Sequence, residues 1–168
     1  REKYVGLQTN MGTVKLGSNR NPNQFLGGVY WDAFVTTNLE ARGNGGMSGG
    51  AFGHFNYFDN SLSYETPNWG GFSAMLVYGL EDVTTATTTT TADDGDYSIG
   101  VQWTGLGGDL QVIAVRNEDK NNSSGAAGDL NIEERNKLGV KYTFLKDYTV
   151  LAQFEQIKND AGTTDADV

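Results

Sequence analysis

The chain alternates apolar and polar residues in short runs, and the connections between these runs are by turns very short and very long. The alternating runs cover residues 3–8, 13–17, 61–66, 72–81, 96–104, 110–118, 134–144 and 148–158. Successive side chains of a strand point to opposite sides, so each run predicts a β-strand with one apolar and one polar face. Tight turns follow the first, third, fifth and seventh runs, whereas long connections follow the other four.

Strands of about nine to eleven residues, with short turns at one end and long loops at the other, are typical of an outer-membrane β-barrel. We therefore expect an all-β fold, an antiparallel transmembrane β-barrel with short periplasmic turns and long extracellular loops. The chain begins inside a run, at residues 1–4, and ends in the polar stretch 160–168. Eight or so strands either close into a very small barrel or belong to a larger one. We expect the second, with residues 1–168 in one domain.

The two phases of each run indicate which face meets lipid. The apolar phase contains Val5, Leu7, Val14, Leu16, Phe72, Ala74, Leu76, Tyr78, Leu80, Tyr97, Ile99, Val101, Trp103, Leu138, Val140, Tyr142 and Phe144. The run 110–118 is apolar in both phases, and the run 148–158 breaks the pattern at Leu151 and Ile157. Alternation alone fits a lipid-facing barrel and a soluble sandwich equally.

The placement of the aromatic residues favours lipid. On the apolar phase, aromatic side chains gather near the short turns (Phe72, Trp103, Phe144 and Tyr148) and near the long loops (Tyr78 and Tyr97). Two such groups are expected at the two interfaces of a bilayer, where amphipathic rings are favoured.

Composition excludes several classes of function. The chain has no Cys, which excludes disulfides, thiolate zinc sites and Cys nucleophiles. A net charge of −9 argues against a nucleic-acid partner. A single His gives little support to a catalytic triad. We expect no enzymatic activity, no cofactor and no metal site.

Two segments resemble a known family. Residues 1–8 read Arg-Glu-Lys-Tyr-Val-Gly-Leu-Gln and residues 11–17 read Met-Gly-Thr-Val-Lys-Leu-Gly. Residues 59–72 read Asp-Asn-Ser-Leu-Ser-Tyr-Glu-Thr-Pro-Asn-Trp-Gly-Gly-Phe. In this order they resemble the strands around the constriction loop of Gram-negative general porins, especially those of the β-proteobacterial and neisserial branch. The second half of the chain agrees mainly in the order of its strand-length runs and of the short and long connections between them.

This resemblance implies the fourth to eleventh strands of a sixteen-stranded barrel. It also implies a homotrimer in the bacterial outer membrane, in contact with the lipid bilayer and lipopolysaccharide. Members of the family pass ions and small hydrophilic solutes by passive diffusion. The connection at about 18–60 would be the loop that folds inward and narrows the pore. The many aromatic residues of this connection favour an ordered loop, and residues 32–36 would form a helical turn.

The chemistry expected of such a pore is electrostatic, because carboxylates facing Arg or Lys across a constriction create a transverse field. The candidate constriction residues are Arg1, Lys15, Asp32, Glu40, Arg42 and His54. Lys15 lies on the polar phase of its run, and the resemblance implies the wall positions of Arg1 and His54. The family commonly has Arg where this chain has Ser18, so that wall charge is either missing here or supplied by Arg20.

Two other functions stay open on the sequence alone. The first is a soluble β-sandwich module that binds carbohydrate or acts as an adhesin, using exposed Trp and Tyr. The second is a non-porin outer-membrane barrel whose lumen is plugged. The placement of the connection at 18–60 separates a pore from a plug.

Overall fold

The computed structural model describes residues 2–32, 37, 57–80, 95–118, 132–159 and 166–167. These residues form β1 (Lys3–Thr9), β2 (Gly12–Arg20), β3 (Tyr57–Glu65), β4 (Phe72–Gly79), β5 (Tyr97–Gly105), β6 (Leu110–Glu118), β7 (Ile132–Phe144), β8 (Tyr148–Asn159) and β9 (Ala166–Asp167). Two helices of one turn follow β2, namely α1 (Pro22–Phe25) and α2 (Gly28–Trp31). A 3-10 turn, η1 (Leu106–Gly108), joins β5 to β6.

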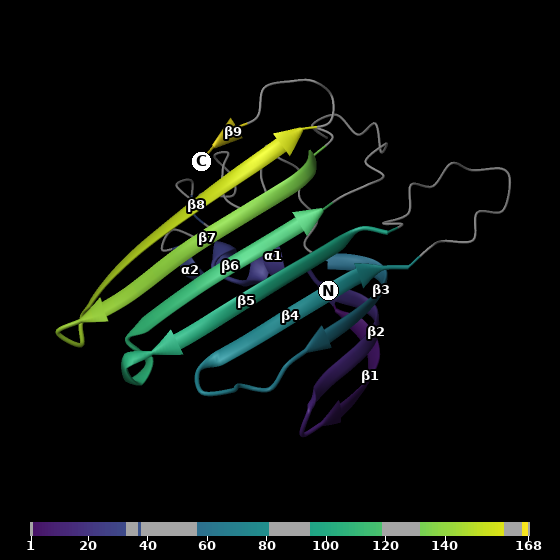
Figure 1. Ribbon diagram of the computed structural model, residues 1–168, viewed down its shortest axis with the longest axis horizontal. Coiled ribbons are helices and arrows are strands. Elements are labelled where there is room, and N and C mark those ends of the chain that lie inside the picture. The colour runs from purple at the N-terminus through teal and green to yellow at the C-terminus, as the bar shows by residue number, and fades with distance from the viewer. Residues whose placement is uncertain are drawn as a thin grey trace, which may run out of the picture.

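All the strands belong to one antiparallel sheet. Each strand pairs with the next along the chain, so their order is β1 to β9, and the short turns lie at the same end of the sheet (Figure 1). Every alternating run of the sequence is a strand, which confirms the predicted all-β fold. The connection between β2 and β3 is shorter than expected, at 21–56, and the two-residue β9 was not predicted. Neither helix in the described part of the chain has the length and apolar character to cross a bilayer.

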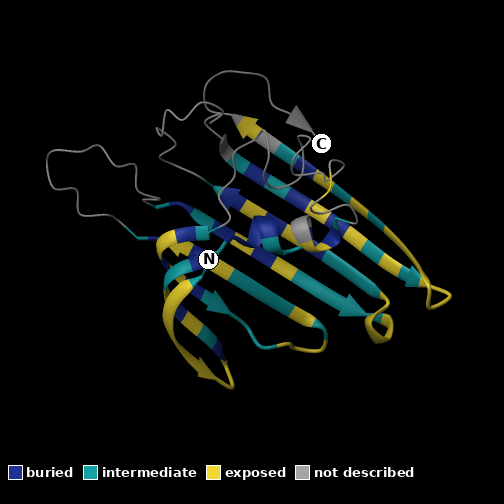
Figure 2. Ribbon diagram, turned by 180° about the vertical axis from the view of Figure 1, so that it is seen from behind, coloured by how far each residue is buried: buried dark blue, intermediate teal, exposed yellow. Residues whose placement is uncertain are grey.

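The two faces of the sheet differ in chemistry, and we name them by the position of the helices. The inner face is the one on which α1 and α2 lie, and the outer face is the opposite one (Figure 2). The outer face carries exposed apolar side chains: Val5, Leu7, Val14, Leu16, Leu62, Phe72, Leu76, Tyr78, Ile99, Val101, Leu138, Val140, Tyr142, Phe144, Val150 and Phe154. The predicted apolar phase is therefore the outer face.

Polar side chains are buried instead on the inner face. They include Lys15, Ser61, Ser63, Ser98, Asn117, Arg135, Lys137 and Glu155. A soluble sandwich has the reverse arrangement, with its apolar side chains packed inside. Apolar side chains that face outward over the whole sheet are instead expected of strands that contact lipid.

The ambiguous pattern of β6 has a structural cause: its inner side chains contact residues 21–32, which we call the folded-in segment, instead of water. Ile113 and Val115 are buried on the inner face. At Gly139, a Cβ atom would lie 2.9 Å from Ile113 Cγ1 and 3.0 Å from Trp31 Cζ3. The sheet, which we call the wall, and α2 therefore approach each other closely there. At Gly100, a Cβ atom would overlap Leu26. Apolar residues in both phases of β6 therefore mark where the segment packs.

Aromatic and charged groups mark the two ends of the outer face. At the turn end, the Phe72 and Trp103 rings lie 6.0 Å apart and the Phe144 and Tyr148 rings lie 5.7 Å apart. At the loop end, Glu134 forms ion pairs with Arg116 at 2.9 Å and with Lys158 at 3.5 Å. Phe144 and Glu134 are about ten residues apart along β7, a length of about 34 Å that spans about 25 Å in a strand tilted by about 40°. That height matches the apolar band of an outer-membrane barrel.

A charge at mid-height of this band tests the lipid-facing assignment. Leu138 is 60% exposed near the middle of β7. We expect Leu138→Arg to lower the free energy of unfolding, measured by denaturant titration in lipid vesicles, by about 2–4 kcal/mol. Tyr148→Arg at the turn end is the control and should cost only about 0–1 kcal/mol. Equal costs at the two positions would contradict a bilayer centred on Leu138.

Candidate functional site

The site begins where the chain leaves β2 and turns onto the inner face. The Asn21 side chain caps α1 by accepting a 2.8 Å hydrogen bond from the backbone N–H of Asn23, and Pro22 occupies the first position of the helix. Gly27 then takes a positive φ of 73° between the helices, a conformation that glycine adopts at no steric cost. A Cβ atom at Gly27 would also overlap Ile113, so this turn lies against the wall. These features place Phe25 and Tyr30 beside the sheet.

A row of four charged residues, Glu2, Lys15, Arg20 and Glu65, lies next to the start of this segment; we call it the charged row. Lys15 Nζ lies 2.5 Å from Glu65 Oε1 and 3.9 Å from Glu2 Oε1. Arg20 Nε lies 2.8 Å from Glu2 Oε2. The charges thus alternate in sign along the row, each cation contacting an acidic neighbour.

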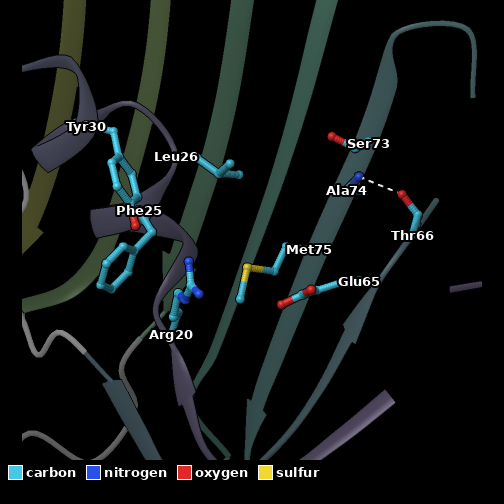
Figure 3. A pocket seen from close by; sticks show the side chains of 9 residues that line it. All are labelled: Arg20, Phe25, Leu26, Tyr30, Glu65, Thr66, Ser73, Ala74 and Met75. Atoms are coloured by element: carbon cyan, nitrogen blue, oxygen red, sulfur yellow. Dashed lines mark hydrogen bonds between the residues drawn. The ribbon is translucent and has the colours of Figure 1, made fainter. Parts of the chain in front are cut away.

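The charged row borders a pocket of about 250 Å³ between the segment and the wall. Its lining residues are Arg20, Phe25, Leu26, Tyr30, Glu65, Thr66, Ser73, Ala74 and Met75 (Figure 3). The segment contributes aromatic rings, with Phe25 and Tyr30 centroids 5.6 Å apart and the Arg20 guanidinium 5.5 Å from the Phe25 ring. The wall contributes the carboxylate of Glu65, the hydroxyls of Thr66 and Ser73, and the Met75 thioether.

Chemically, this arrangement suits passage and orientation of a solute better than reaction. Opposite charges set side by side create a local field that acts on ions and dipoles in the adjoining space. Among the described residues, no three His, Cys, Asp or Glu side chains come together as metal ligands. The pocket offers hydroxyl, carboxylate, guanidinium and ring surfaces, which are groups that solvate small hydrophilic molecules.

The structure places some of the predicted site residues and not others. Lys15 lies on the inner face and is 7% exposed. Asp32 directly follows α2, as its C-terminal cap, and is partly exposed. Arg1, Glu40, Arg42 and His54 lie outside the described residues, as does most of the helical turn predicted at 32–36.

Sequence reasoning missed several members of the site. Glu2 and Glu65 were not among the candidate constriction residues, and Tyr30 counted only among the aromatic residues that favour an ordered loop. The pairing of β2 with β3 sets Ser63 opposite Lys15 and places Glu65 diagonally across from it. That register follows a connection of more than thirty residues, so the sequence alone did not give it. The two helices had one available signal, Asn21 followed by Pro22, which is a common start of a helix.

The sheet and the site together define part of a membrane β-barrel with a charged inner wall and a folded-in segment. The sequence model of the Gram-negative porin family matches residues 1–168, so the chain belongs to this family and is part of a bacterial outer-membrane protein. Porins are channel proteins and not enzymes.

Among solved structures, the anion-selective porin from Comamonas acidovorans is similar to this chain, with a TM-score of 0.65 and 25% sequence identity. The similarity covers 99% of this chain and 49% of that one, so this chain spans about half the length of that porin. A search of the curated proteins found no match.

The ion pair between Lys15 and Glu65 is testable by a double-mutant cycle. We expect Lys15→Met and Glu65→Gln to be coupled by about 0.5–3 kcal/mol in the free energy of unfolding. The value should fall in the lower part of that range because the Glu65 side chain is 34% exposed and is screened by solvent. As the control, Lys15→Met and Glu134→Gln on the outer face should be additive within about 0.5 kcal/mol. A Lys15–Glu65 coupling no larger than that of the control pair would show that the two charges do not interact.

Proposed function

We propose that the complete protein forms a water-filled channel for passive diffusion of ions and small hydrophilic solutes across the outer membrane. The observation that carries this proposal is that the sheet places its apolar and polar side chains on the opposite faces from those of a soluble sandwich. The apolar side chains of the sheet face outward, and its charged side chains line a pocket on the inner face, beside a segment that folds in against the wall. Membership of the porin family supports the same function.

Both alternative functions fit these observations less well than a channel does. A soluble carbohydrate-binding or adhesin module needs its apolar side chains buried, whereas here they are exposed over the outer face, and the family is that of a membrane protein. A plugged barrel needs the folded-in segment to fill the lumen. Residues 21–32 instead pack along the inner faces of β4 to β8 and leave the pocket beside β3 and β4, which favours an open channel.

We propose that the connection between β2 and β3 is the constriction loop of this channel, within a single barrel domain. Lys15 and Asp32 are the predicted constriction residues that the structure describes, and the charged row supplies Arg20, Glu2 and Glu65 beside Lys15. Arg1, Glu40, Arg42 and His54 stay predictions. Opposite charges across this narrowing would orient dipolar solutes and bias the passage of ions.

The partners of the complete protein follow from its class. We propose that it is a homotrimer, that its outer face contacts lipid and lipopolysaccharide, and that it has no enzymatic activity. The ion-paired residues Arg116, Glu134 and Lys158 at the loop end of the outer face would lie level with lipid headgroups, where charged side chains are well solvated.

Recordings of single channels test the function directly. The complete protein, extracted in detergent and added to a planar bilayer under a salt gradient, should produce stable conductance steps, in groups of three if it is a trimer. Complete silence from correctly folded protein would contradict an open channel and favour a plugged barrel.

Charge variants then test the constriction by the reversal potential. Lys15→Gln removes a positive charge from the inner wall and should shift selectivity toward cations. Glu65→Gln and Asp32→Asn remove negative charges and should shift it toward anions. Lys3→Gln makes the same charge change as Lys15→Gln but on the outward phase of β1, so it should leave the reversal potential near that of the unmodified protein. If Lys15→Gln and Lys3→Gln behave alike, Lys15 does not line the constriction.

A further inference from the structure

Four polar residues are fully buried where the first helix of the folded-in segment meets the wall. Asn23 belongs to α1, Arg135 and Lys137 to β7, and Glu155 to β8; each is at most 1% exposed. Charged side chains are almost never fully buried unless they are paired. Arg135, Lys137 and Glu155 lie on β7 and β8, whereas the charged row lies beside β1 to β3, so the site described above does not account for them.

Their contacts converge on Asn23 and Glu155. Glu155 Oε1 accepts a 3.2 Å hydrogen bond from Asn23 Nδ2 and lies 3.1 Å from Arg135 Nε. Glu155 Oε2 lies 4.0 Å from Lys137 Nζ, and Lys137 Nζ donates a hydrogen bond to the backbone oxygen of Asn23. The wall thus holds Asn23 at two points, its side-chain amide and its carbonyl. We call Asn23, Arg135, Lys137 and Glu155 the buried clamp.

Apolar packing at the same contact has a different character. Leu26 and Trp31 pack against the wall at Gly100 and Gly139, and such contacts bring surfaces together without fixing direction. The buried clamp consists of directional bonds to charged groups, and the loss of one partner removes a bond from groups that stay buried. It therefore fixes where along the wall α1 sits.

The position of α1 matters for the pocket because Phe25 and Leu26, two and three residues after Asn23, line one side of it. We propose that the buried clamp positions the folded-in segment and so sets the width of the passage, Asn23 and Glu155 being its positioning residues. The effect on passage rests on the proposed channel function, whereas the effect on the segment does not.

An exchange of donor and acceptor tests the buried clamp. Glu155→Gln removes its only carboxylate, and Asn23→Asp sets a second carboxylate against Glu155. In the double variant the new amide at position 155 donates to the new carboxylate at position 23, so the contact and the negative charge are both restored with reversed polarity. Glu134→Gln is the matched control, since Glu134 is ion-paired to Arg116 and Lys158 on the outer face.

The first measurement is hydrogen exchange of the complete protein folded in detergent. The Leu26 N–H bonds to the Pro22 oxygen and the Trp31 N–H to the Gly27 oxygen, so these two amides report on the segment. Each single variant should speed their exchange by about tenfold or more, as expected for loss of a hydrogen bond to a charged group. The double variant should return exchange toward that of the unmodified protein, and Glu134→Gln should not change it.

The second measurement is single-channel current. Each single variant should change the conductance and increase the noise of the open channel, and the double variant should restore both. If Glu155→Gln does not fold, Asn23→Asp alone still decides, because Asn23 lies outside the strands. Single variants that match Glu134→Gln in exchange, or a double variant no better than the worse single one, would overturn the proposal. Silence of the unmodified protein would refute the channel function, while hydrogen exchange would still decide the clamp.

Discussion

Backbone hydrogen bonding inside a bilayer is the constraint on which the rest of this structure depends. Lipid offers no partner to a free N–H or C=O group, so a strand in the membrane must be paired on both sides. Pairing each strand with the next one along the chain meets this demand with the shortest turns, and it orders the sheet from β1 to β9. The same constraint leaves side chains free to sort by solvent, apolar ones toward lipid and polar ones inward.

The inner face then divides into two regions with different neighbours. Beside β1 to β3, charged side chains pair with one another along an open pocket. Along β4 to β8, α1 and α2 cover the inner face, which contains apolar residues, glycines and buried charged side chains there. The first region is suited to contact with solutes, and the second is suited to holding the segment that shapes the first. The same sheet therefore carries both the charged pocket and the contacts that hold the segment beside it.

The sequence predicted the part of this arrangement that depends on a period of two. Alternation identified every strand from β1 to β8 and assigned Leu138 and Val101 to the outer face, because lipid contact acts on each residue of a strand separately. It gave no clear phase for β6, because Ile113 and Val115 contact protein on the inner face instead of water.

The interactions between distant parts of the chain were not predictable in this way. The pairing of Lys15 with Glu65 depends on the register between β2 and β3, and the contact of Asn23 with Glu155 joins residues 132 positions apart. Neither leaves a periodic trace in the sequence. The resemblance of residues 1–17 and 59–72 to porin strands supplied the inward fold of the connection, but not the residues that hold it.

At Gly100 and Gly139 the wall has recesses that alanine scanning would not identify as contacts with the segment. At both positions the segment occupies the space that a side chain would take, so the contact depends on an atom that is missing. Alanine scanning looks for function by making residues smaller, yet at a glycine it makes the residue larger. A survey of that kind would report the two glycines as intolerant backbone positions, whereas they are the recesses into which the segment fits.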